Sequence, residues 1–131
     1  MTLSKVLNTI YMQPLFISEY TSTIPFELSG INASQSIPPV VYGHFLKFLC
    51  YFHLNDRHGY LASLEDLQLA IAEKYFIKDS NDKSGSYNCL GVAFQLIEKY
   101  NLARKAFVES IALLPEPMMN IAYQRLRHVQ L

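Results

Sequence analysis

The sequence predicts an all-α domain in which antiparallel helix hairpins are stacked into a short superhelix. Apolar residues recur at spacings of three and four in several segments, a period typical of amphipathic helices. Polar, turn-forming clusters separate these segments at short intervals, and short connections favour antiparallel neighbouring helices. No segment shows a clear strand pattern. The 131 residues suit one domain with one core.

Residues 1–39 are expected to form a short helix followed by an irregular segment. Apolar residues between positions 3 and 11 fit one helix face, and Pro14 ends that helix. The connector that follows, residues 16–37, is rich in serine, glycine and proline. It either caps one end of the stack or lies along a binding groove as an internal ligand.

Residues 40–83 are expected to contain the first hairpin. Pro38 and Pro39 suit the start of a helix, where the missing backbone N–H costs nothing, and this helix is expected to run over residues 40–54. The cluster at residues 55–59 predicts a turn. A second helix is expected over residues 60–76.

A second hairpin and a last helix are expected downstream. The polar run at residues 78–85 predicts a loop, and a third helix is expected over about residues 86–98. A turn leads to a fourth helix, which ends at Pro115. The last helix is expected over residues 118–129, with arginines in its final turns, where positive charge suits the helix dipole.

A glycine lies in the middle of the third predicted helix. Gly91 costs a helix about 1 kcal/mol relative to alanine, so its place calls for a packing reason. Seven residues around it follow one spacing: Tyr87, Leu90, Gly91, Phe94, Ala103, Phe107 and Pro115. This spacing resembles the 34-residue tetratricopeptide repeat, and residues 84–117 look like one complete repeat. Only Ser110 departs mildly, since the repeat has alanine there.

The resemblance divides the chain into units. Two helices approach closely only where side chains are small, and Gly91 and Ala103 supply that closeness in the clear repeat. Residues 40–83 look like a divergent repeat with Cys50 as the small residue. Residues 118–131 would begin a third unit or form the terminal capping helix.

Such repeats imply a non-enzymatic protein–protein interaction scaffold that binds a peptide or protein partner on its concave face. The first helix of each hairpin lines that face. The positions that would face the partner are Lys47, Tyr51, Leu54, Asn88, Val92, Gln95, Ala122, Arg125 and Leu126. Because charged residues make up only 17% of the chain, some of its surface is expected to face a partner.

One well-known subclass of the family recognises the acidic C-terminal tail of chaperones through a carboxylate clamp. Lys47 stands where the first clamp lysine would be. The other clamp positions are occupied by Tyr51, Cys89, Met119 and Tyr123, which cannot replace asparagine, lysine and arginine. Chaperone-tail recognition is therefore not expected, and an apolar helix or extended peptide suits the groove better.

The alternative is a structural self-association module that dimerises a larger protein. About three repeats are normally needed for stability, and this chain offers two hairpins and one further helix. Either residues 1–39 cap the stack or two copies bury their open ends as a homodimer. An apolar face at residues 1–12 or 118–131 would mark the second arrangement.

No enzyme, cofactor or metal site is expected. Cys50 and His53 are three residues apart on one helix, but only Cys89 is left to complete a site, and the histidines are dispersed. A net charge of zero argues against nucleic acid or an anionic membrane as partner. Two cysteines without a signal peptide or an 18-residue apolar run predict a cytoplasmic protein.

Overall fold

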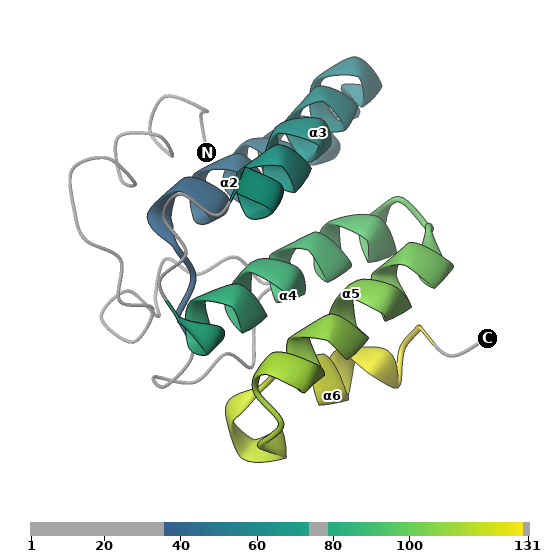
Figure 1. The fold of residues 1–131 in the computed structure, drawn as a ribbon. Coiled ribbons are helices and arrows are strands. Elements are labelled where there is room, and N and C mark those ends of the chain that lie inside the picture. Colours follow the sequence, from purple (N-terminus) through teal and green to yellow (C-terminus); the bar gives the residue numbers. More distant parts are fainter. Residues whose placement is uncertain (1–35, 74–78, 130–131) are drawn as a thin grey trace.

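The structure, a computed structural model, describes residues 36–73 and 79–129 and forms two helix hairpins followed by a short C-terminal segment (Figure 1). Residues 1–35, on which the expected N-terminal helix and most of the connector fall, lie outside the described residues. The elements are α2 (Pro39–His53), α3 (Arg57–Glu73), α4 (Ser80–Leu96), α5 (Tyr100–Leu113), the 3-10 turn η3 (Pro117–Met119) and α6 (Ala122–Leu126).

The two hairpins stack on each other. Helix α2 packs against α3, and α4 packs against α5 (Figure 1). Helix α4 also contacts both α2 and α3, while α6 lies against α5. Within the described residues the chain has helices and no strand, so the predicted all-α stack of antiparallel hairpins is confirmed.

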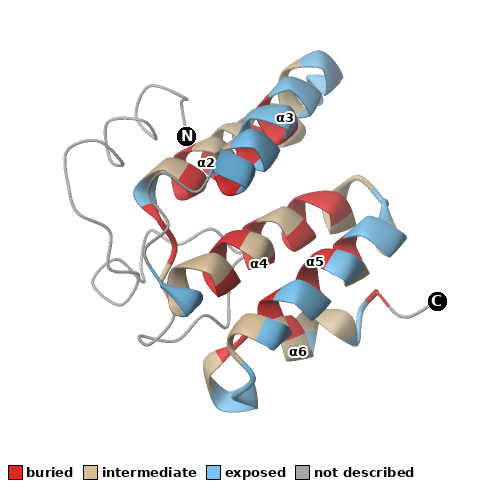
Figure 2. Ribbon diagram, viewed as in Figure 1, coloured by how far each residue is buried: buried red, intermediate tan, exposed pale blue. Residues whose placement is uncertain are grey.

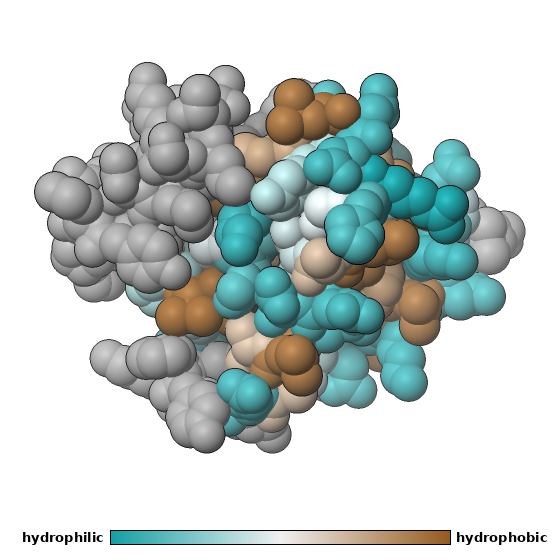
Figure 3. Space-filling view, turned by 90° about the horizontal axis from the view of Figure 1, so that it is seen from above, coloured by the Kyte–Doolittle hydropathy of each residue, from teal (hydrophilic) through white to brown (hydrophobic). Residues whose placement is uncertain are grey.

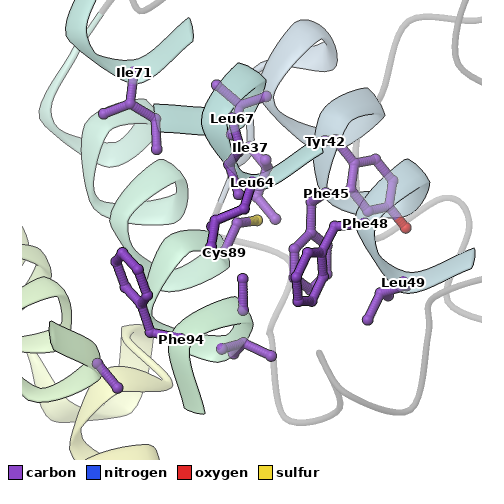
Figure 4. Close-up of a cluster of buried hydrophobic side chains, with 14 of the residues drawn as sticks. Ile37, Tyr42, Phe45, Phe48, Leu49, Leu64, Leu67, Ile71, Cys89 and Phe94 are labelled. Carbon is purple, nitrogen blue, oxygen red and sulfur yellow. The ribbon is translucent and has the colours of Figure 1, made fainter. Parts of the chain in front are cut away.

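The main core lies where α2, α3 and α4 meet (Figures 2 and 4). Phe45 and Phe48 of α2, Leu67 of α3 and Cys89 of α4 have no exposed surface. Aromatic rings extend this core along α2, where the ring centroids of Phe48 and Phe52 are 5.9 Å apart. This buried apolar surface is what joins the first hairpin to the second.

Helix α4 begins six residues earlier than the sequence predicted. The polar run expected as a loop forms its first turns, because Asp79 caps the helix by accepting a hydrogen bond from the backbone N–H of Asp82 at 2.9 Å. Ser36 fixes the same turn by donating its backbone N–H to the side chain of Asn81 at 3.1 Å. Ser84 is buried and hydrogen-bonded, so its polarity is no sign of a loop.

The prediction of one continuous last helix over residues 118–129 is wrong. It is split into η3 and the five-residue α6, with Asn120 between them in an extended conformation. The Asn120 side chain accepts from the backbone N–H of Ala122, the first residue of α6, at 2.9 Å, and this local hydrogen bond competes with a continuous helix. The helical spacing of apolar residues in the sequence does not show that the Asn120 side chain competes for backbone hydrogen bonds.

Helix α4 runs unbroken through Gly91, which lies directly against α5. A Cβ atom at this position would be 2.6 Å from Cε1 of Phe107, closer than carbon atoms can approach. The prediction that this glycine serves close helix packing is therefore confirmed. The hairpin α2–α3 differs, because Gly59 of the second helix lies against the Tyr51 ring, where an added Cβ atom would be 2.5 Å from Cδ1 of Tyr51. Cys50, predicted as the small buried residue, is only half-buried.

We expect Gly91→Ala to destabilise the protein although alanine is the better helix former. The added methyl group meets a fully buried ring, and overpacking costs about 1–3 kcal/mol, against a helix-propensity gain of about 1 kcal/mol. Urea unfolding should show a lower free energy of unfolding. The double variant Gly91→Ala/Phe107→Leu should recover part of the loss, and a Gly91→Ala protein as stable as the wild type would contradict the close approach.

Candidate functional site

Three of the nine residues predicted to face a partner are buried within the chain. Asn88 and Ala122 have no exposed surface, and Val92 is 1% exposed. Val92 and Ala122 belong to the apolar core, and the Asn88 side chain donates to Oδ1 of Asn120 at 2.9 Å. These positions were expected on an open face of the first helices, and in this conformation they cannot contact a partner.

A fourth position, Tyr51, is turned toward its own hairpin. Its ring packs on Gly59 of α3 and is half-buried there. The missing side chain at Gly59 lets the ring approach α3 closely. Part of the Tyr51 ring is thus used inside the hairpin, and its contact with a partner stays a prediction.

The other five predicted positions keep exposed surface. Leu54 follows the end of α2 and is 74% exposed. Lys47 on α2, Gln95 on α4, and Arg125 and Leu126 on α6 are half-buried, and Leu126 packs partly against the core. The most exposed of the predicted positions is thus Leu54 at the end of α2, and Lys47 and Gln95 are the accessible positions within the two long first helices.

Unpartnered polar atoms occur on the same two helices. Nδ1 of His44 and Oε1 of Gln95 are buried without a hydrogen-bond partner, although both side chains are only partly buried. Burial lowers the pKa of His44; the nearby Asp66 opposes this shift and Lys47 reinforces it, so the imidazole is largely neutral at neutral pH. A buried polar atom without a partner costs about 1–3 kcal/mol, which a ligand supplying that partner would recover. Sequence reasoning did not single out His44.

A buried cluster of polar side chains joins α4, α5 and the C-terminal segment. The hydroxyl groups of Ser84 on α4 and Ser110 on α5 are 2.8 Å apart, and Ser110 donates to the backbone carbonyl of Ser84 at 3.0 Å. The Asn120 amide donates to Oγ of Ser84 at 3.1 Å, to Oγ of Ser110 at 3.0 Å and to the carbonyl of Leu114 at 3.0 Å. One side chain thus ties three parts of the chain together.

This cluster is structural, and it explains the one mild departure from the repeat pattern. Ser110 occupies a position where alanine would suffice for packing, but its hydroxyl is used for hydrogen bonds inside the hairpin. The only sequence signal was a pair of serines, but Ser84 fell in the run predicted as a loop and Ser110 in the fourth predicted helix. Their partner Asn120 could not be found from the sequence, because it lies in a segment predicted as a helix interior.

Neither cysteine is placed for chemistry. Cys89 is fully buried in the inter-hairpin core, and burial raises the pKa of its thiol. Burial also raises the pKa of the half-buried Cys50, so both thiols stay protonated at neutral pH. In residues 36–73 and 79–129 no three His, Cys, Asp or Glu side chains come together as a metal site. No helix among these residues is both long and apolar enough to span a bilayer.

Comparison with protein-family models, with curated proteins and with solved structures gave no match.

We expect Asn120→Ala to lower the free energy of unfolding by about 1–3 kcal/mol, because the substitution leaves buried serine and carbonyl groups without partners. Urea unfolding measures the loss, and hydrogen exchange should show faster exchange in α6 than in α2. Asn101→Ala, at an exposed asparagine at the start of α5, is the matched control and should be nearly neutral. Equal stability of the two variants would contradict the structural role of Asn120.

Proposed function

We propose that this chain is a non-enzymatic protein–protein interaction module of the tetratricopeptide type, which binds a peptide or protein segment along α2 and α4. The observation that carries the proposal is the stacking of two antiparallel hairpins whose first helices, α2 and α4, pack against each other. Stacks of this kind present their first helices as a continuous binding surface. The stacked hairpins and the repeat-like spacing of residues 84–117 together support the proposal.

The chemistry of α2 and α4 suits an extended peptide. Lys47 offers a positive charge and Gln95 an amide, and both side chains are half exposed. Oε1 of Gln95 is buried without a partner, so a peptide N–H group could donate to it only after the side chain turns outward. The unpartnered Nδ1 of His44 lies on the neighbouring first helix and is buried in the same way. A peptide main chain crossing both helices would reach these atoms only if the two side chains change conformation.

The surface is narrower than the sequence suggested. Asn88 and Val92 are buried, so the partner would contact the exposed side of α4 near Gln95 rather than the whole first helix. Both cysteines are free, which suits a reducing compartment such as the cytoplasm.

Peptides selected from a displayed random library should bind the intact chain through α2 and α4. We expect the double variant Lys47→Ala/Gln95→Ala to weaken the selected peptides about tenfold or more, the effect of losing about 1.4 kcal/mol of binding energy. Fluorescence polarisation with labelled peptides measures the affinity. The control Glu65→Ala/Glu109→Ala changes exposed residues on the second helices α3 and α5 and should leave the affinity unchanged. A control that weakens binding as much as the test variant would contradict the proposal.

A self-association module is the second candidate, and exposed apolar residues on α3 favour it. Leu61 and Leu69 lie two turns apart on this helix and are 39% and 57% exposed. On the face seen in Figure 3, however, hydrophobic residues form separate patches between hydrophilic ones. The expected apolar face at the C-terminus is largely used inside the chain, because Ile121, Ala122 and Val129 are buried.

Light scattering over a range of concentrations distinguishes the two candidates. If α3 forms a dimer interface, we expect a mass near twice 15.0 kDa for the wild type and a monomer for Leu69→Glu, because a charge would be buried at the interface. Gln68→Glu adds the same charge to an exposed neighbouring position and should keep the dimer. A monomeric wild type at all concentrations would exclude the self-association reading.

A further inference from the structure

The chain has no net charge, but its charges are unevenly distributed over the fold. We define the turn edge as residues 53–61, 97–105 and 125–129, which contain the two hairpin turns and the C-terminal end. Its six basic and two acidic side chains give a net charge of +4: Arg57, Lys99, Arg104, Lys105, Arg125 and Arg127 against Asp56 and Glu98. The rest of the described residues carry two basic and seven acidic side chains, a net charge of −5.

The three segments of the turn edge lie at the same end of the stack. Figure 1 shows the α2–α3 turn, the α4–α5 turn and the C-terminus at the right-hand ends of their helices. The side chain of Arg104, near the start of α5, donates to the backbone carbonyl of Val129 at 3.3 Å. This hydrogen bond places the C-terminal arginines beside the first turns of α5. The opposite end holds the acidic start of α4 and Glu116, after the end of α5.

Four of the six positive charges of the turn edge are available to a partner. Arg57, Lys99, Lys105 and Arg127 are exposed, and none of them forms an ion pair with another residue in the described part of the chain. Clustered charges of one sign attract an oppositely charged partner over about 8 Å at physiological ionic strength. The edge therefore carries a positive potential that the neutral composition conceals.

Exposed leucines lie among these charges. Leu54 at the α2–α3 turn is 74% exposed, and Leu102 in the first turn of α5 is 46% exposed. Nucleic acid binds best to an uninterrupted basic surface, and here Asp56 and Glu98 interrupt the basic residues. The apolar side chains form no favourable contact with a phosphate backbone. A protein segment that combines carboxylates with apolar side chains would use both features.

We propose that the turn edge is a second interaction surface, distinct from the first-helix surface of α2 and α4, and that it binds an acidic protein segment carrying apolar side chains. Carboxylates of the partner pair with Lys99, Lys105 and Arg127, and its apolar side chains cover Leu54 and Leu102. The charges set the rate and orientation of association, and the leucines slow dissociation by excluding water.

The test uses the intact chain and a labelled synthetic peptide in which glutamate and aspartate alternate with leucine. Fluorescence anisotropy should show binding at 50 mM NaCl that weakens markedly at 300 mM, because screening acts on exposed charges. Lys99→Glu/Lys105→Glu should weaken binding at least tenfold. Lys83→Glu/Gln68→Glu/Ala72→Glu makes the same change in net charge, −4, away from both proposed surfaces and should have less than a twofold effect. Leu102→Ser should weaken binding without changing its salt dependence.

Several results would overturn the proposal. Equal losses for the two charge-matched variants would show a general charge effect without a site. Tighter binding of a single-stranded oligonucleotide than of the peptide would assign the edge to nucleic acid. A concentration-dependent mass that Lys99→Glu/Lys105→Glu abolishes would show that the acidic end of a second copy occupies the edge. Absence of peptide binding at 100 μM protein would refute the proposal directly. Thermal unfolding followed by circular dichroism checks that each variant is folded.

Discussion

The structure depends on how closely α4 and α5 approach each other at Gly91. The missing side chain lets the Phe107 ring lie against the backbone of α4, and every contact of α6 with α5 follows from the position of that hairpin. The first hairpin has a similar contact, but its glycine is on the second helix. Gly59 of α3 packs against the Tyr51 ring of α2. In both cases the packing of a large ring against a helix offsets the cost of a glycine within it.

Close packing sets the distance between helices, and buried hydrogen bonds set the place of the C-terminal segment. Apolar contacts alone tolerate small shifts, whereas Asn120 finds its partners on Ser84, Ser110 and Leu114 in one arrangement only. A buried polar group without a partner is costly, so this network penalises every other position of α6. It also explains why such a short helix is held in place, since five residues have little stability of their own.

The predictions from the sequence were right for features that follow from the regular spacing of buried apolar residues. They were wrong where polar residues are buried. The fold class, both hairpins and the packing role of Gly91 followed from apolar spacing and turn clusters. The start of α4 was missed because Asp79 and the polar residues after it look like a loop, although they form a capped, partly buried helix end. The break before α6 and the buried position of Asn88 both involve the Asn120 side chain, which accepts from the backbone N–H of Ala122 and from the amide of Asn88, distant in the sequence. No local pattern reveals such a pairing. The close contact of the first hairpin was not predicted, because its small residue is Gly59 on the second helix and not Cys50 on the first.

The net charge of the chain was the least informative quantity taken from the sequence. It sums positive and negative residues that the described fold places in different regions. Antiparallel hairpins bring all turns of one kind to one edge, so residues 57, 99 and 127, which are far apart in the chain, contribute to a single potential. Acidic residues gather elsewhere by the same topology, at the start of α4 and after α5. An acidic partner would therefore approach the described part of the molecule from the turn edge. The first-helix surface lies between these ends and carries Lys47 and Gln95, so a bound segment there would run along the charge gradient. Its acidic residues would be drawn toward the turn edge, and the direction of a peptide on α2 and α4 would follow from the charges at the two ends of the stack.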